Sequence, residues 1–240
     1  MLARDRYFRF LGEARAENDL TALRHRFERS ARWYARRLRK HLPVDRTVAC
    51  LDVPCGSGNF LYFLRRQGYR DIVGYDNDTR QIERACALAL PARRRDAMEI
   101  LAEDSRTYGL ISSLDFVEHL SRDEALRFIG LCHERLEPGG ALVLRTPSAD
   151  GPFGAHDAWN DLTHCWAMSS QVLEAVLEMM GFNRVVVLDE RPQPYNPVNT
   201  VRAALFVAAR ACASAAVFAL GLSPPRIWSR SMWGIGYKAP

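Results

Sequence analysis

The chain has 240 residues and a net charge of +5, with 48% hydrophobic and 25% charged residues. This composition is typical of a soluble globular protein with its own core, and it excludes a repeat or low-complexity protein. The charged N-terminal stretch lacks the apolar run of a signal peptide, and the six cysteines form no CxxC pair. We therefore expect free thiols in the reducing cytoplasm, and neither disulfides nor a zinc site.

The N-terminal section is basic. Residues 1–46 contain 13 Arg and Lys against 6 Asp and Glu. Such a section can meet phosphate on nucleic acid, lipid headgroups or a sugar nucleotide, although a solvated helix face has the same composition. Within it, residues 20–42 carry apolar side chains at helical spacing and precede Pro43, which predicts one helix.

Strand-like and helix-like segments alternate after this section. Short apolar runs predict strands over 48–53, 71–76, 94–98, 108–117, 141–147 and 183–190. Helical patterns cover 59–67, 79–90, a segment from Ser121 to the turn at 138–140, and 169–182. Regular alternation predicts an α/β fold with a doubly wound, mostly parallel sheet that helices cover on both faces.

A glycine turn follows the first predicted strand. From Asp52 to Gly58 the chain reads Asp-Val-Pro-Cys-Gly-Ser-Gly. Glycines in a strand-to-helix turn let the backbone approach a ligand closely. A dinucleotide-binding fingerprint would need a third glycine where Leu61 stands, and here an acidic residue ends the strand instead.

This turn resembles the first motif of class I methyltransferases that use S-adenosyl-L-methionine (SAM), acidic-x-Gly-x-Gly-x-Gly, with a proline at the first glycine. The resemblance covers about residues 47–240 and implies a seven-stranded sheet that ends in an antiparallel strand. It also implies that the cofactor SAM lies against Asp52, Pro54, Cys55, Gly56 and Gly58. Because proline fixes φ and lacks an N–H, the turn tolerates it only if that position has an ordinary negative φ.

Ligands of such sheets bind beyond the carboxyl ends of the strands. Asp76 ends the second strand, 18 residues after Gly58, and we expect it to accept hydrogen bonds from both ribose hydroxyls, with Asn77 beside it. Asp78 is the alternative ribose ligand.

The third and fourth strand ends complete the expected cofactor site. The resemblance implies that Asp96 faces the adenine amino group and that Ala97 offers its backbone to the ring. A salt bridge to the arginines before Asp96 is the alternative. The resemblance also implies that Leu114 and Asp115 line the methionine end of SAM.

Further motifs resemble a bacterial branch of the superfamily that methylates sugars in polysaccharide and glycolipid assembly. They are Arg145-Thr146-Pro147-Ser148, Asp150-Gly151-Pro152-Phe153-Gly154 and Asn160-Asp161-Leu162-Thr163-His164. Glu118-His119 after the fourth strand resembles a Glu-His pair of many members of the superfamily. Residues 146–168, predicted to lack regular structure, mix polar and aromatic groups, namely Asp150, Phe153, His156, Asp157, Trp159, Asp161, His164 and Trp166. Aromatic rings stack on sugar faces and the polar groups bind hydroxyls. Alternatively, His164 and Trp166 simply anchor the loop.

A sugar hydroxyl needs a general base to become a good nucleophile. The candidates are His164, His119 and Asp161, in that order, and Asp161 is also expected to orient His164. No metal is expected, although a divalent cation held by Asp161 and nearby carboxylates is the alternative. The predicted function is thus O-methylation of a sugar hydroxyl on a nucleotide- or lipid-linked glycan.

Two other functions remain open from the sequence. The protein could methylate an apolar small molecule such as a quinone, or bind SAM without turnover because of Pro54. A nucleic-acid acceptor is not expected, because the chain has no base-flipping motif and no RNA-binding module.

Residues 203–222 are almost wholly apolar and are interrupted by Arg210. They reach the length of a membrane span, but a charge near the middle of a span costs about 2.5–3.5 kcal/mol. We expect peripheral membrane contact at the inner face, or contact with a partner such as a second copy in a homodimer. Packing on the domain is the alternative.

The expected organisation has four parts. They are a basic helical extension over 1–46, a SAM-binding domain over 47–190, an apolar helical insertion over 191–229, and the last strand of the SAM-binding domain over 230–240.

Overall fold

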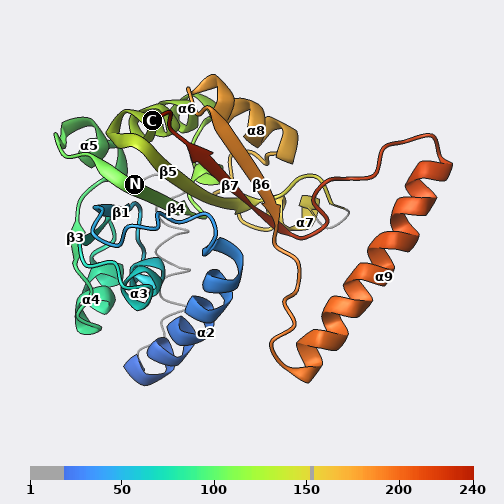
Figure 1. Cartoon of the computed structure of the whole chain (residues 1–240), viewed down its shortest axis with the longest axis horizontal. Coiled ribbons are helices and arrows are strands. Elements are labelled where there is room, and N and C mark those ends of the chain that lie inside the picture. Colours follow the sequence, from blue (N-terminus) through green and yellow to red (C-terminus); the bar gives the residue numbers. More distant parts are fainter. Residues whose placement is uncertain (1–18, 152–153) are drawn as a thin grey trace.

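The computed structural model describes residues 19–151 and 154–240 (Figure 1). Residues 1–18 of the basic section lie outside the described residues, as do Phe153 and the side chain of Asp157, which belong to the segment 146–168.

One seven-stranded sheet forms the centre of the molecule, in the strand order β3-β2-β1-β4-β5-β7-β6. The strands are β1 (Cys50–Asp52), β2 (Ile72–Asp76), β3 (Ala92–Arg94), β4 (Tyr108–Leu114), β5 (Leu136–Pro147), β6 (Arg184–Asp189) and β7 (Ser231–Tyr237). β7 runs antiparallel to both of its neighbours, and the other pairs are parallel. This arrangement confirms the predicted fold, including its antiparallel last strand.

Helices cover both faces of the sheet (Figure 1). Those in the described residues are α2 (Leu20–Leu38), α3 (Asn59–Arg66), α4 (Thr79–Ala87), α5 (Ala97–Glu103), α6 (Arg122–Arg135), α7 (Gly154–Trp159), α8 (Ser170–Met179) and α9 (Pro197–Ala219), together with the 3-10 turn η1 (Val117–His119). Buried side chains of α5, α6 and α8 form one core cluster, and those of α2, α3 and α4 form the other. The two clusters lie on opposite faces, because neighbouring side chains along a strand alternate between them.

The basic helix α2 belongs to the packed core. The carboxylate of Asp19 accepts a hydrogen bond from the backbone N–H of Thr21 and caps the helix. Leu23 and Phe27 are buried on its apolar stripe, while its arginines cover the other side. Tyr34 packs edge-on against Trp233 of β7, with 5.7 Å between the ring centroids. The boundary of an extension at residue 46 stays a prediction.

Several predicted boundaries were wrong for local reasons. The third strand ends at Arg94, not at Met98, because Asp96 accepts hydrogen bonds from the N–H groups of Met98 and Glu99 and so begins α5. The fourth strand ends at Leu114, because Asp115 has a φ of +54° that a strand does not tolerate. The loop after β5 contains α7, which the sequence pattern did not indicate.

A close approach between β2 and the glycine turn shapes the carboxyl end of the sheet. A Cβ atom on Gly74 would lie 2.5 Å from Leu61 Cδ1 and 2.8 Å from Cys55 Cβ. Glycine is required there because any side chain would push the turn and α3 away from β2.

We expect Gly74→Val to lower the free energy of unfolding by about 1–3 kcal/mol, since overpacked cores shift backbone and rotamers. Urea unfolding followed by circular dichroism measures the change. Gly130→Ala in α6 is the matched control: the new methyl group would meet Met180 Sδ at an ordinary 3.7 Å, and helical Gly→Ala is neutral or stabilising. Equal stability of the Gly74 variant and the wild type would contradict the close approach.

Candidate active site

The turn between β1 and α3 places backbone groups at the carboxyl end of the sheet. Its left-handed residues are Gly56 at φ +51° and Gly58 at φ +85°, and Pro54 is not among the residues with positive φ. The turn is held by hydrogen bonds from Cys55 N–H to Tyr75 O at 2.8 Å and from Gly58 N–H to Cys55 O at 2.9 Å. Because Pro54 does not have a positive φ, the turn accommodates a proline at this position of the motif. No heavy atom lies within 4 Å of the position that a Cβ on Gly56 would occupy, so that side of the turn is open.

Asp76 at the end of β2 is bound to this turn. Its Oδ2 accepts a hydrogen bond from Gly56 N–H at 2.9 Å, and its Oδ1 accepts one from Asp78 N–H at 2.9 Å. The side chain is largely buried, and burial raises the pKa of its carboxyl above the ordinary value. Of the neighbouring candidates, Asn77 is exposed, whereas the carboxylate of Asp78 caps α4 by accepting from Arg80 N–H.

Asp52 at the end of β1 is buried more deeply, with 2% of its surface exposed. Ser112 of the neighbouring strand β4 donates a hydrogen bond to its Oδ1 at 2.7 Å. Burial raises the pKa of Asp52 to about 7, and the charge of Asp76 adds to the shift, while the Ser112 hydrogen bond opposes it. This carboxyl group can therefore exchange a proton near neutral pH.

Asp96 and Ala97 lie at the start of α5. One carboxylate oxygen of Asp96 caps the helix, which orients the side chain, and Ala97 is buried. Of the arginines before Asp96, Arg95 pairs with Glu103 on the same helix. Asp96 and Ala97, which were predicted to end the third strand, thus lie at the N-terminus of α5.

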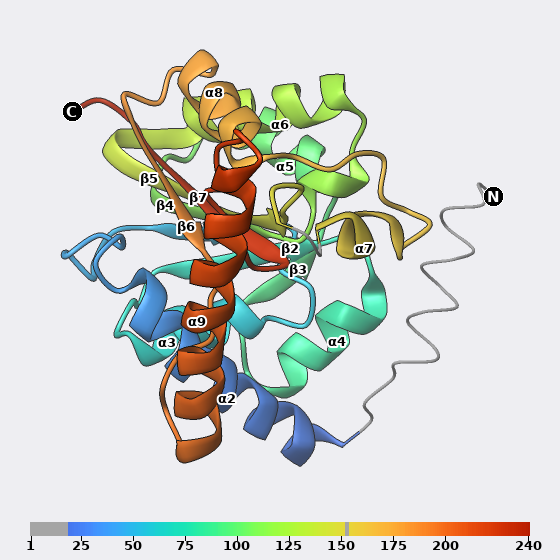
Figure 2. The ribbon, with the colours of Figure 1, turned by 90° about the vertical axis from the view of Figure 1, so that its right-hand side faces the viewer.

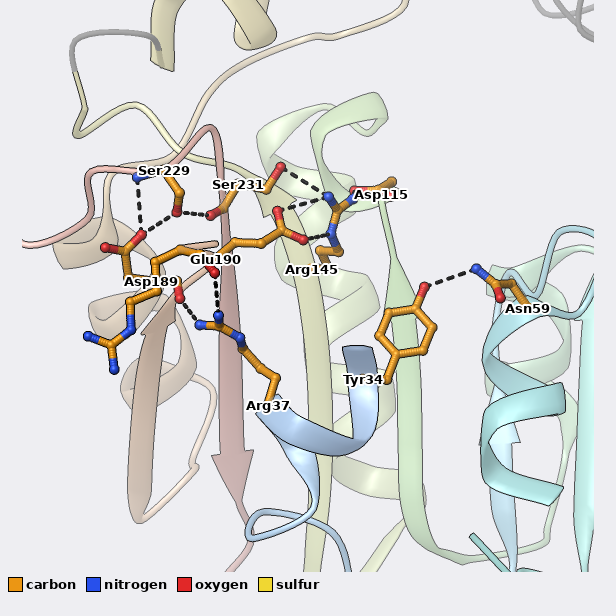
Figure 3. Close-up of polar contacts among 10 residues, drawn as sticks. Tyr34, Arg37, Asn59, Asp115, Arg145, Asp189, Glu190, Ser229 and Ser231 are labelled. Atoms are coloured by element: carbon orange, nitrogen blue, oxygen red, sulfur yellow. Dashed lines mark hydrogen bonds and ion pairs between the residues drawn. The ribbon is translucent and has the colours of Figure 1, made fainter. Parts of the chain in front are cut away.

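Asp115 and Leu114 lie at the end of β4, where Arg145 dominates the local charge (Figure 3). Arg145 of β5 pairs with the Asp115 carboxylate and holds Glu190 by two hydrogen bonds of 2.8 and 2.9 Å. Burial opposes its charge, but the two carboxylates outweigh burial and raise the pKa of its guanidinium above the ordinary value. Ser231 Oγ lies 3.3 Å from the same guanidinium.

Arg145 therefore joins the carboxyl ends of β4, β5 and β6 to the start of β7. The sequence pattern did not indicate this role for Arg145, because its partners Asp115, Glu190 and Ser231 are 30, 45 and 86 residues away along the chain. On the α2 side of the same cluster, Arg37 donates to the backbone oxygens of Asp189 and Arg191 (Figure 3).

The predicted catalytic residues lie close together after β4. His119 Nδ1 lies 2.8 Å from Thr163 Oγ1, and Thr163 Oγ1 donates to Asp161 Oδ1 at 2.6 Å. The rings of His119 and His164 meet edge-on with 4.8 Å between centroids. The Asp161 carboxylate accepts hydrogen bonds from Thr163, and the Asp161 backbone oxygen accepts one from His164 N–H at 3.2 Å. The carboxylate therefore serves His119 by way of Thr163, a link that sequence reasoning missed.

This chain of hydrogen bonds fixes which nitrogen of His119 carries a proton. Burial would raise the pKa of Asp161, but its hydrogen bonds from Thr163 and the nearby imidazoles hold it below the ordinary value, so the carboxylate is ionised and only accepts. The single hydroxyl proton of Thr163 then points to Asp161, and the Thr163 oxygen accepts from His119 Nδ1–H. The lone pair of neutral His119 is therefore on Nε2, where it can accept a proton.

Glu118 lies beneath this pair of histidines. It is 2% exposed, and Thr146 donates a hydrogen bond of 3.1 Å to its Oε2. Burial and the charge of Asp115 raise the pKa of Glu118 to about 8. Glu118, His119 and His164 each place one ligand atom within 4.8 Å of the others, so among the described residues these three form a group that could hold a divalent cation. The cation expected as an alternative was centred on Asp161, which bonds Thr163 here.

The loop after β5 is anchored to the end of β4. Cys165 N–H donates to Glu118 O at 2.8 Å, and Trp166 Nε1–H donates to Val117 O at 3.2 Å. Trp166 therefore has the anchoring role that the sequence left as an alternative. Trp159, by contrast, is 66% exposed at the end of α7.

Comparisons with known proteins agree with this architecture. A family profile described as a methyltransferase domain matches residues 22–187. Curated relatives include the tRNA U34 carboxymethyltransferase of Pseudoalteromonas translucida, 25% identical over 167 residues, which are 65% of this chain and 51% of that protein. A second such enzyme, from Azotobacter vinelandii, is 27% identical over 168 residues, with coverage of 65% and 52%. The chain thus spans about half the length of the curated relatives it matches.

Solved structures show the same fold. A SAM-dependent methyltransferase from Archaeoglobus fulgidus superposes with a TM-score of 0.63 at 20% identity, covering 97% of this chain and 99% of that one. Magnesium protoporphyrin IX methyltransferase from Synechocystis, a structure with bound S-adenosylhomocysteine (SAH), has a TM-score of 0.54 at 15% identity and covers 90% and 83%. The family profile covers more than half of the chain. The chain therefore belongs to the methyltransferase domain family, in agreement with the class of enzyme predicted from its sequence.

Proposed function

We propose that the protein transfers a methyl group from SAM to a sugar hydroxyl of a nucleotide- or lipid-linked glycan. The observation that carries this proposal is the chain from Asp161 through Thr163 to His119, which makes Nε2 the basic nitrogen of His119 just beyond the end of β4. The family and its SAM-dependent structural neighbours support the methyl transfer, whereas the acceptor rests on the site alone.

The residues present fit SAM. The open side of Gly56 leaves room for the nucleoside, and Asp76 presents a fixed carboxylate to the ribose. We assign Asp96 and Ala97 to the adenine, and Leu114 with the peptide of Asp115 to the methionine end, as the family resemblance implies. The buried carboxyls of Asp52 and Asp76 favour a cationic ligand, because a nearby positive charge offsets the cost of ionising them away from water.

SAM supplies an electrophilic methyl group on a positively charged sulfur, and that sulfur keeps the bonding electrons when the methyl leaves. The protein's own task is to align the acceptor hydroxyl and to take its proton. We assign the proton to His119 Nε2, with Thr163 and Asp161 as positioning residues that hold Nδ1–H. His119 is placed first because Thr163 and Asp161 fix its Nδ1–H, and His164, whose ring meets that of His119 edge-on, is placed second, the reverse of the order expected from the sequence.

The acceptor assignment rests on the loop that carries Asp161 and His164. Its exposed Trp159 offers an apolar face for a sugar ring, while the imidazoles offer hydrogen-bonding partners for hydroxyls. A nucleic-acid acceptor is the second candidate, because the curated relatives are tRNA enzymes and α2 presents many arginines. Salt-dependent binding of tRNA by the purified protein would favour that second candidate.

Asp76→Asn should weaken SAM binding by about tenfold to a hundredfold, since hydrogen bonds to a charged group contribute about 1.5–3 kcal/mol. Isothermal calorimetry with SAM and SAH measures the change. Asp71→Asn is the matched control, because Asp71 is exposed at the opposite end of β2, where it pairs with Arg106. Failure of the folded wild type to bind SAM would refute the cofactor assignment, and unchanged binding by the Asp76 variant would refute its ribose role.

SAM binding should release a proton near neutral pH. A bound cation favours the ionised form of Asp52, whose pKa is about 7 without it, so affinity should rise with pH between about 6 and 8. Calorimetry in two buffers of different ionisation enthalpy counts the released protons. Asp52→Asn should remove most of this pH dependence, and a wild-type affinity that falls with pH would show that the sign is wrong.

His119→Ala should lower kcat by about 10²–10⁴-fold and leave the Kd for SAM unchanged, because the imidazole acts on the acceptor. Transfer of labelled methyl groups to a panel of nucleotide sugars and lipid-linked glycans provides the assay. Thr163→Val should reduce kcat by a smaller factor and Thr163→Ser should restore it. The control is His25→Ala, at an exposed position of α2. Full activity of Thr163→Val would exclude the proposed positioning chain.

A further inference from the structure

The connection between β6 and β7 contains the 23-residue helix α9, which the structure describes in full and in which no residue is buried. At about 1.5 Å per residue it is roughly 34 Å long. It stands beside the body of the protein, to which the segments before and after it connect it (Figures 1 and 2). Among the described helices it alone is long and apolar enough to cross a membrane, with a mean hydropathy of 1.6.

The two sides of α9 differ in chemistry. The partly covered residues recur every three or four positions and include all the polar groups of the central turns. They are Asn199, Ala203, Phe206, Arg210, Ala213, Ser214 and Val217. Arg210 lies 3.7 Å from Asp189 at the end of β6, so this stripe faces the protein.

The outward side is wholly apolar. Its exposed residues are Val201, Ala204, Leu205, Ala208, Cys212, Ala215 and Ala219. Leu205 is 63% exposed, and Phe218 at the edge of this side is 75% exposed. A helix on the surface of a soluble protein has the opposite arrangement, with its polar side toward water. The outward side of α9 therefore suits an apolar environment.

The charges around α9 distinguish between the environments that could cover it. From residue 191 to the end of β7 the chain contains five arginines, at 191, 202, 210, 226 and 230, and no Asp or Glu. Arg210 and Arg226 pair with Asp189 and Glu174, whereas Arg191 and Arg202 are exposed near the first turn of α9. A second copy meeting this one through the same segment would offer these arginines no carboxylate, whereas anionic lipid headgroups would attract them.

Helix α2 extends the same positive surface. Arg37 donates to Arg191 O at 2.8 Å, and the guanidinium of Arg36 lies 5.6 Å from the ring centroid of Tyr195, just before α9. Exposed basic residues of α2 and of the turn after it continue from there, namely Arg24, Arg26, Arg29, Arg32, Arg39 and Lys40. Figure 2 shows α2 passing behind the lower half of α9.

We propose that α9 lies in the surface of an anionic lipid bilayer, with its apolar side among the acyl chains and with Arg191, Arg202 and the neighbouring Arg36 on the headgroups. Arg210 and its partner Asp189 stay on the protein side. A spanning orientation would instead place Arg210 at the centre of the bilayer, which costs about 2.5–3.5 kcal/mol. In the interfacial orientation the apolar side of α9 contacts the acyl chains, and the stripe that carries Arg210 contacts the protein.

Flotation of the full chain with vesicles tests this proposal. We expect binding to vesicles of mixed phosphatidylglycerol and phosphatidylcholine, at least about tenfold weaker binding to phosphatidylcholine alone, and loss of binding as salt rises. Leu205→Glu should reduce binding at least about tenfold. The matched control Asn199→Glu adds the same charge to the protein-facing stripe and should keep binding within about twofold.

Two further measurements distinguish a lipid bilayer from a second copy of the chain as the surface that contacts α9. A fluorophore on Cys212, in a variant carrying Cys86→Ser and Cys165→Ser, should shift its emission to the blue on anionic vesicles. Retained SAM binding by Leu205→Glu would show that the fold is intact and that the membrane result is independent of the proposed function. Absence of vesicle binding by the wild type would overturn the proposal, as would a dimer in sedimentation that Leu205→Glu dissociates without any lipid.

Discussion

Three carboxyl groups buried at one edge of the sheet set the chemistry of this protein. Asp52 ends β1, Asp76 ends β2 and Glu118 follows β4, and burial raises the pKa of each. Because the folded-state pKa values exceed the unfolded ones, the free energy of unfolding falls as the pH rises from about 4 toward 7 for Asp52 and 8 for Glu118. At neutral pH these groups lower stability, and a cationic ligand at this edge offsets that cost.

Arg145 lies at the same edge and lowers the pKa of Glu118, but burial and the charge of Asp115 raise that pKa by more. Its guanidinium is saturated by Asp115, Glu190 and Ser231, which hold the ends of four strands in register. The backbone makes the complementary contribution on the other side: Gly74 lets the turn at Gly56 pack onto β2, and Asp76 fixes that turn. The ion pairs of Arg145 therefore hold together the half of the edge formed by β4 to β7. The half formed by β1 and β2 keeps the carboxyl groups of Asp52 and Asp76 for a ligand.

The sequence predicted the sheet and its strand-end residues because both follow from local patterns. Apolar runs alternate with capped helices, and acidic residues follow the runs at Asp52 and Asp76. It failed where a short element depends on one side chain, as at Asp96, whose capping of α5 ends a three-residue strand. It also could not pair His119 with Thr163, because residues 44 apart along the chain meet only once the loop after β5 folds back on β4.

The position of α9 connects the two proposals. The helix leaves the sheet after Asp189 at the end of β6 and returns at Ser231 at the start of β7, and Ser229 near its return donates to Asp189. Because β7 is antiparallel, both attachment points lie at the carboxyl edge that carries Arg145 and, beyond it, Asp115. A bilayer that holds α9 would therefore hold this edge close to its surface. Of the two glycan carriers, a lipid-linked one is present at such a surface, which favours it over a soluble nucleotide sugar as the acceptor.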